Sequence, residues 1–121
     1  MANVEQLAKL KKPFEAYEGD APYVFVSYSH QDVEIVFIEL VRLKKLGFRV
    51  WYDEGISPGS RWSDALAERI ANCNLFLYYV TPRSVASQNC QDEANYVLEA
   101  GNPFLAVHLE RTELPPGLKL R

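Results

Sequence analysis

The sequence feature that most limits the fold is an unbroken apolar and aromatic run from Leu75 to Val80. The run has the length of a strand, and a strand with no polar position is typical of a parallel sheet whose two faces are both buried. The segment from Thr81 to Ser84 stops this strand, and a polar segment leads into a helix with Ala94, Val97 and Leu98 at three-to-four spacing. The chain must therefore supply helices for both faces of the strand.

Three other segments have the composition of strands and alternate with helical patterns. They are residues 23–28, 48–52 and 104–109. One predicted helix begins after Asp32, which is placed to cap it, and ends at Gly47. The apolar stripe of this helix is Val33, Val36, Phe37, Leu40 and Leu43. A further helix follows the second strand, and its apolar stripe is Trp62, Ala65, Leu66 and Ile70. Four strands that alternate with three helices through right-handed crossovers predict a doubly wound α/β domain.

Composition and charge exclude several classes of partner. The 121 residues are enough for one domain with a single core. The net charge is −3 and no basic run is present, so we expect neither a nucleic acid nor an anionic membrane as a partner. The longest apolar runs are of strand length and the N-terminus lacks the apolar region of a signal peptide, which predicts a cytoplasmic protein. Cys73 and Cys90 are too few for a disulfide framework or a structural zinc site, and we expect both to be reduced.

The turns after the predicted strands exclude three standard chemistries of doubly wound domains. A dinucleotide-binding fold needs G-x-G-x-x-G after the first strand and a P-loop needs a glycine-rich run that ends in Lys-Ser or Lys-Thr, but the first turn reads Ser-Tyr-Ser-His-Gln-Asp. A phosphoacceptor domain needs an acidic residue at the end of the third strand, which here ends at Val80 and Thr81. His30 and His108 are far apart in the sequence, so no metal site is expected, and each is interpreted as a loop or strand-end residue.

Three motifs in order along the chain resemble one family. They are Phe25 to Asp32, the loop that ends Ser57-Pro58-Gly59-Ser60-Arg61-Trp62, and Ser84-x-x-Ser87-x-x-Cys90-x-x-Glu93. With these motifs the chain resembles the Toll/interleukin-1 receptor (TIR) domain, in particular its prokaryotic members, from about Tyr23 to Pro116. The resemblance implies a flavodoxin-like fold with the sheet order 2-1-3-4-5.

The same resemblance divides the chain into an N-terminal extension, residues 1–22, and a TIR domain, residues 23–121. The extension begins with a short amphipathic stretch, which either caps the domain or belongs to a neighbouring segment. The family's domain continues through a fifth strand and a final helix, so we expect this domain to be truncated at its C-terminus. A fragment of a longer chain and a divergent short domain both fit, and we favour the fragment. A further domain would then be fused to it or regulate it.

For function, the resemblance implies NAD⁺ cleavage with Glu93 as the catalytic residue. In the enzymatic members a Ser-x-x-Ser-x-Trp-Cys-x-x-Glu pattern opens the third helix, and its Glu is essential. That Glu is Glu93 here, and Asn89 occupies the position of the Trp. One carboxylate suffices, because the nicotinamide of NAD⁺ is already cationic and leaves as a neutral ring without a general acid. By residue type alone Glu93 reads as a solvated helix residue, and the motif around it favours catalysis.

NAD⁺ is expected as the substrate, with no cofactor and no metal. The candidates for contacting it are Tyr28, Ser29, His30, Trp62 and Asn89. The first three follow the first strand and are placed to meet ribose or phosphate, since open parallel sheets bind ligands at that edge. Trp62 either stacks on a base or anchors its helix in the core. Ser84 and Ser87 are interpreted as helix caps and not as nucleophiles, because no base stands beside them in sequence.

The segment from Asp53 to Arg61 corresponds to the family's interaction loop. Its candidate residues are Asp53, Ile56, Pro58, Gly59 and Arg61. The Pro-Gly pair fixes a turn, so the loop can dock on a second TIR domain and complete a composite site. We therefore expect an NAD⁺ glycohydrolase in bacterial defence or signalling that is activated by self-association and yields ADP-ribose or a cyclic form. The alternative is a non-catalytic module for homotypic assembly, which depends on this loop and on exposed helical faces.

Overall fold

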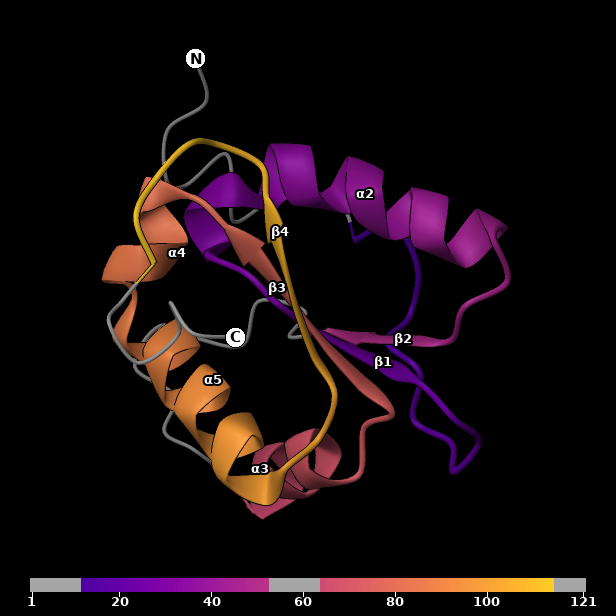
Figure 1. The fold of residues 1–121 in the computed structure, drawn as a ribbon. Coiled ribbons are helices and arrows are strands. Elements are labelled where there is room, and N and C mark those ends of the chain that lie inside the picture. Colours follow the sequence, from indigo (N-terminus) through magenta and orange to yellow (C-terminus); the bar gives the residue numbers. More distant parts are fainter. Residues whose placement is uncertain (1–11, 53–63, 115–121) are drawn as a thin grey trace.

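The computed structural model describes residues 12–52 and 64–114, and within them four strands form one parallel sheet (Figure 1). The strands are β1 (Val24–Ser27), β2 (Val50–Tyr52), β3 (Leu75–Val80) and β4 (Phe104–His108). Strand β3 has the predicted bounds, and the other three are shorter than the segments predicted for them. The order across the sheet is β2-β1-β3-β4, with every neighbouring pair parallel. This confirms the predicted order of the first four strands and the flavodoxin-like α/β fold.

Helices cover both faces of the sheet. Helix α2 (Val33–Lys45) lies on one face, and α3 (Asp64–Ala71) and α5 (Gln88–Ala100) lie on the other (Figure 1). These three helices are the ones that the sequence predicts. Two short elements add to them, the 3-10 helix η1 (His30–Asp32) after β1 and α4 (Pro82–Ala86) after β3. No helix within the two described ranges is long and apolar enough to cross a membrane.

Helix α4 occupies a segment for which the sequence predicts only a polar connection. Thr81 Oγ1 accepts a hydrogen bond from the Ser84 amide at 3.0 Å, and Ser84 Oγ accepts one from the Thr81 amide at 2.9 Å. Pro82 stands at the first helical position, where its missing N–H leaves no partner unsatisfied. The prediction that this segment stops β3 is confirmed. The prediction of a polar connection is wrong, because the reciprocal caps of Thr81 and Ser84 start a helix.

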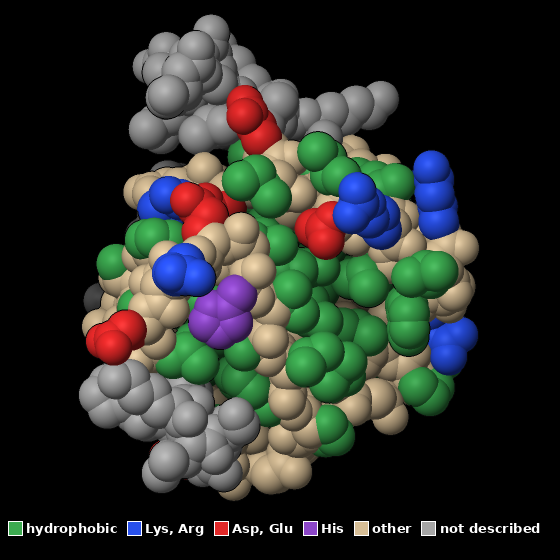
Figure 2. All heavy atoms as spheres, turned by 45° about the horizontal axis from the view of Figure 1, so that its top comes forward, with side chains coloured by type: hydrophobic (Ala, Val, Ile, Leu, Met, Phe, Trp, Pro, Cys, Tyr) green, Lys and Arg blue, Asp and Glu red, His purple; other side chains and the backbone are tan. Residues whose placement is uncertain are grey.

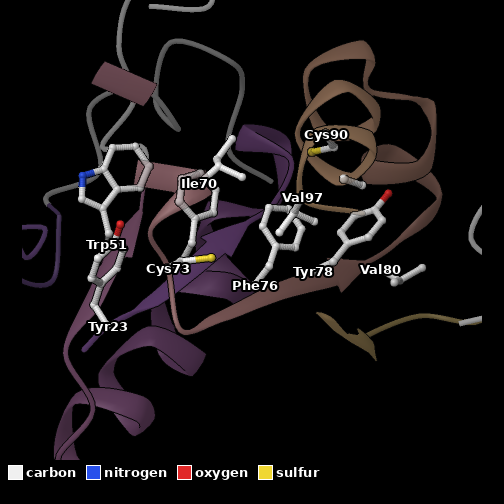
Figure 3. Close-up of a cluster of buried hydrophobic side chains, with 11 residues drawn as sticks. Tyr23, Trp51, Ile70, Cys73, Phe76, Tyr78, Val80, Cys90 and Val97 are labelled. Atoms are coloured by element: carbon white, nitrogen blue, oxygen red, sulfur yellow. The ribbon is translucent and has the colours of Figure 1, made fainter. Parts of the chain in front are cut away.

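The core between the sheet and helices α3 and α5 is aromatic at its centre (Figure 3). The Phe25 ring stacks on the Trp51 ring at 4.8 Å and on the Phe76 ring at 5.3 Å between centroids, which links β2, β1 and β3. Burying each of these rings stabilises the fold by about 1.5–3 kcal/mol. The helices contribute Ile70 from α3 and, from α5, Cys90, Ala94 and Val97.

The opposite face of the sheet packs on α2. Val33, Val36 and Leu40 are the buried residues of this helix, as its apolar stripe predicts. Strand β3 contributes Leu77 and Tyr79 to the same core, while its alternate residues belong to the core on the other face. Its apolar run is therefore explained by burial on both faces.

Glycine residues follow the ends of both long helices. Gly47 comes after α2 with φ of 96°, and Gly101 comes after α5 with φ of 78°. Both values lie in the left-handed region, which glycine adopts without the steric cost of a Cβ atom. The prediction that Gly47 stops its helix is confirmed.

Residues 12–22 pack against the domain instead of extending from it. The Tyr17 amide donates a hydrogen bond to the Val50 carbonyl of β2 at 2.9 Å. The guanidinium of Arg69 in α3 donates another to the Gly19 carbonyl at 3.0 Å. This described part of the predicted extension therefore lies along β2 and α3.

Several large apolar side chains lie on the surface. Ile35 of α2 is 45% exposed and Ile38 is 58% exposed. Leu46 and Phe48 after this helix and Leu105 of β4 are exposed as well. Figure 2 shows hydrophobic side chains over a broad area of the face that includes α2. A broad apolar surface of this kind is typical of a site where a protein binds a partner.

Candidate active site

A pocket of about 520 Å³ opens at the carboxyl end of the sheet. Its walls come from the end of β1, from η1, from α4 and from the first two turns of α5. Open parallel sheets bind ligands at this edge, because the connections that follow the strands diverge there. The lining includes every described candidate of the predicted site: Tyr28, Ser29, His30, Asn89 and Glu93.

Glu93 lies in the second turn of α5 and is only 7% exposed. Ser27, the last residue of β1, donates a hydrogen bond from Oγ to Glu93 Oε1 at 2.7 Å. The helix begins after Ser87, whose Oγ accepts a hydrogen bond from the Cys90 amide at 3.3 Å. This cap fixes where α5 starts and therefore which of its residues face the sheet. Glu93 is a buried pocket residue and not the solvated helix residue that its type alone suggests.

Cys90 lies one turn before Glu93 and is 2% exposed. Burial, and after it the charge of Glu93, raise the pKa of the Cys90 thiol to about 11. A thiol with this pKa is neutral at physiological pH and is a poor nucleophile. Cys90 and Cys73 are both free thiols, as the sequence predicts. In the pocket Cys90 therefore serves as an apolar wall.

The residues that follow β1 form the opposite wall. Tyr28 and Ser29 are buried, whereas His30 is exposed. The rings of Tyr28 and His30 lie 5.2 Å apart between centroids. Ser29 Oγ accepts a hydrogen bond from the Gln31 amide at 3.3 Å, which caps η1. Asn89 is exposed and lines the pocket from α5. These contacts place aromatic and polar groups on the two sides of the cavity.

The other predicted site residues lie outside the described ranges. They are Trp62 and the interaction-loop residues Asp53, Ile56, Pro58, Gly59 and Arg61. Their roles stay predictions. Ser87 is described and caps α5, as the sequence predicts. Ser84 is also a capping residue, but it caps α4, a helix that the sequence does not predict.

An ionic network centred on the buried Asp32 borders the pocket. Asp32 is predicted to cap α2, but its side chain makes no cap hydrogen bond. Asp32 Oδ2 instead accepts a hydrogen bond from Thr81 Oγ1 at 2.6 Å, and Oδ1 pairs with the guanidinium of Arg83. Arg83 forms a second ion pair with Glu110, which follows β4. The network ties together the segments that follow β1, β3 and β4.

The sequence holds a weak signal for this network. Asp32, Arg83 and Glu110 each follow a different predicted strand, and a parallel sheet brings the carboxyl ends of its strands to one edge. Opposite charges at that edge are therefore expected to meet. Asp32 and Arg83 are 51 residues apart, so no local spacing identifies them as partners.

The chain is an α/β domain with a parallel sheet. Its pocket lies where the strands end and contains a buried carboxylate, which makes this end of the sheet the candidate ligand site. A family model described as the TIR domain matches residues 24–121. The chain therefore belongs to the TIR domain family. A comparison with curated proteins gave no match.

Solved structures of TIR proteins share this fold. The TIR domain of the Toll-related receptor TRR-2 from Hydra magnipapillata aligns with a TM-score of 0.67 and 21% identity, over 78% of this chain and 76% of that chain. A metazoan TIR-STING receptor from C. gigas aligns with a TM-score of 0.67 and 21% identity, over 92% of this chain and 37% of that chain. The TIR domains of the activated Roq1 resistosome, which recognises the effector XopQ, align with a TM-score of 0.58 and 19% identity, over 73% and 57%. At these identities the likeness shows the fold alone.

We predict that Asp32→Asn lowers the free energy of unfolding by about 1.5–3 kcal/mol, because it removes a buried charge that is hydrogen-bonded to Thr81 and Arg83. Urea denaturation followed by circular dichroism measures this change. Glu15→Gln is the control, since Glu15 is exposed and pairs with Lys12 at 2.9 Å, and the loss of this surface pair should cost less than about 1 kcal/mol. An equal decrease in the free energy of unfolding in the two variants would contradict a stabilising role of the network around Asp32.

The raised pKa of Cys90 predicts a loss of stability at alkaline pH. The pKa of a cysteine in an unfolded chain is about 8.5, whereas the pKa of Cys90 in the folded domain is about 11. Between these values the folded state binds more protons than the unfolded state, so the free energy of unfolding falls as pH rises. In urea denaturation at a series of pH values, we expect Cys90→Ala to make this fall shallower. A slope identical to that of the wild type would show that Cys90 does not hold its proton as proposed.

Proposed function

We propose that the chain is a TIR-domain NAD⁺ glycohydrolase of the prokaryotic type, acting in bacterial defence or signalling, with Glu93 as its catalytic residue. The main support is the burial of the Glu93 carboxylate in a pocket at the carboxyl edge of the sheet, with Ser27 bonded to one of its oxygens. A buried carboxylate costs free energy, and such groups in clefts are concentrated at functional sites. The domain motif around Glu93 points to the same residue.

The pocket suits one end of a dinucleotide. Its volume of about 520 Å³ falls in the range of small-molecule sites. The ring of Tyr28 supplies an apolar surface, and the side chains of Ser29, His30 and Asn89 supply hydrogen-bonding groups for ribose or phosphate oxygens. The composition of the walls therefore fits a ligand that is part aromatic ring and part sugar phosphate.

The proposed reaction breaks the bond between C1′ of the ribose and the nicotinamide nitrogen. The electron pair of that bond stays on the nicotinamide ring, which loses its positive charge and leaves as a neutral molecule. The charge that develops on the ribose is stabilised by the carboxylate of Glu93, and this stabilisation is largest in a buried site of low dielectric. Water then forms the new bond to C1′ and releases a proton to solvent. In a cyclisation, a nucleophilic atom of the same ligand takes the place of water.

Self-association is part of the proposal. The exposed apolar residues of α2, Ile35 and Ile38, are suited to bury against a second copy of the domain. The Roq1 TIR domains, which share this fold, are part of an activated resistosome. The same surface supports a second candidate function, a non-catalytic module for homotypic assembly. In either case we propose that the domain acts in the cytoplasm and is fused to, or regulated by, another domain.

Glu93→Gln is expected to lower the rate of nicotinamide release by a factor of about 100 or more, because a neutral amide cannot stabilise the developing positive charge. Chromatography of a reaction with millimolar NAD⁺ and concentrated protein measures the release. Glu99→Gln makes the same substitution at an exposed position of the same helix and should retain the wild-type rate. Wild-type turnover by Glu93→Gln would rule out its catalytic role. No release by assembled wild-type protein would favour the assembly module.

Substitution of Ile38 tests the association surface. Ile38→Ser removes an apolar side chain that is 58% exposed, and we expect it to weaken self-association by about tenfold, as for a central interface residue. Tyr96→Ser is the matched control, because Tyr96 is 37% exposed and lies on α5, across the sheet from α2. Sedimentation velocity over a range of concentrations gives the dissociation constants. Weakening by Tyr96→Ser and not by Ile38→Ser would place the interface elsewhere.

A further inference from the structure

The hydrogen bond between Ser27 and Glu93 has no role in the reaction as written above. Ser27 is 1% exposed and is the last residue of β1. Its register partner on β3 is Tyr78, and the side chains of this pair face α5, where Glu93 lies. A hydroxyl buried at this depth needs a partner, and the Ser27 hydroxyl donates to the carboxylate of Glu93.

We propose that Ser27 is the positioning residue for the Glu93 carboxylate, an inference that rests on the proposed function. A glutamate side chain has several rotatable bonds, and fixing them costs up to about 2 kcal/mol in rotamer entropy. A hydrogen bond of 2.7 Å to a charged group is strong enough to offset a cost of that size. Ser27 thus fixes, before the substrate arrives, an orientation that the transition state requires.

Strand β1 provides a rigid base for this donor. It pairs with β2 on one side and with β3 on the other, and all four of its residues are buried. Groups placed on central strands keep their geometry better than groups placed on loops. On the same face of β1, Phe25 belongs to the aromatic core. Ser27 is therefore the position at which this face of β1 changes from apolar core to polar site.

The hydroxyl of Tyr78, the register partner of Ser27, does not form a second hydrogen bond to Glu93. The Tyr78 hydroxyl is buried and has no hydrogen-bonding partner among the described residues. Burial raises the pKa of Tyr78, and the nearby Ser84 hydroxyl offsets part of the rise, although its contact falls short of hydrogen-bond geometry. Ser27 and Tyr78 both have hydroxyls on the side of the sheet that faces α5, and the hydroxyl of Ser27 is the one bonded to Glu93.

A positioning role predicts a change in kcat and not in KM. The walls that bind the ligand are unchanged when the Ser27 hydroxyl is removed, so the affinity for NAD⁺ is retained. The carboxylate loses its fixed orientation, and stabilisation of the transition state is lost with it. The loss of one hydrogen bond to a charged group corresponds to a decrease in rate of about tenfold to a hundredfold.

The kinetic test compares Ser27→Ala with Tyr79→Phe. Tyr79 is 4% exposed and belongs to the core on the α2 face, so Tyr79→Phe removes the hydroxyl of a buried residue on the opposite side of the sheet. Nicotinamide release gives kcat and KM, with kcat referred to the folded fraction from thermal melts. We expect kcat of Ser27→Ala to fall about tenfold to a hundredfold while KM changes by less than about twofold. Wild-type kcat in Ser27→Ala, or an equal fall in Tyr79→Phe, overturns the proposal.

Crystal structures of the wild type and of Ser27→Ala add a readout that does not depend on turnover. We expect the Glu93 carboxylate to be displaced, or to occupy several conformations, when the Ser27 hydroxyl is absent. A carboxylate that keeps its place in Ser27→Ala overturns the positioning role, whether or not the wild type cleaves NAD⁺. A displaced carboxylate in a protein without activity supports the positioning of Glu93 by Ser27 and rejects the glycohydrolase.

Discussion

The burial of β3 on both faces is the constraint on which the rest of the structure depends. The strand pairs with β1 and β4, and its alternate residues enter the cores under α2 and under α3 and α5. Such a strand presents almost no polar side chain until it ends. Thr81, the first residue after it, is fully buried and donates a hydrogen bond to Asp32. Buried polar side chains therefore follow β3 at the carboxyl edge of the sheet.

Two buried carboxylates at this edge have different surroundings. Asp32 is bonded to Thr81 and paired with Arg83, and this pairing joins segments that follow three strands. Glu93 is bonded to Ser27 and lines the pocket. Burial of a carboxylate is tolerated only where hydrogen bonds or opposite charges compensate for lost water. Asp32 meets this condition as a structural residue, whereas Glu93 meets it through Ser27 while lining the pocket.

Local patterns were sufficient to predict much of the fold, because each depends on neighbours in sequence. The run from Leu75 to Val80 predicted β3, and Ser87, one of two serines interpreted as helix caps, is the residue that caps α5. Helix α4 was not predicted, because Thr81 and Ser84 are residue types that are equally common in polar turns. The motif around Glu93 identified the candidate carboxylate, but its donor, Ser27, is 66 residues away, and only the register of the sheet and the start of α5 bring the two together.

The central claim is that the pocket beside Glu93 binds NAD⁺. The most direct test is a titration of ¹⁵N-labelled protein with NAD⁺, followed by two-dimensional NMR. The account predicts that the amide signals which move belong to the pocket wall, with Ser29, Arg83 and Asn89 among them. Signals that stay unchanged at millimolar NAD⁺, or changes confined to the outer side of α2, would contradict it.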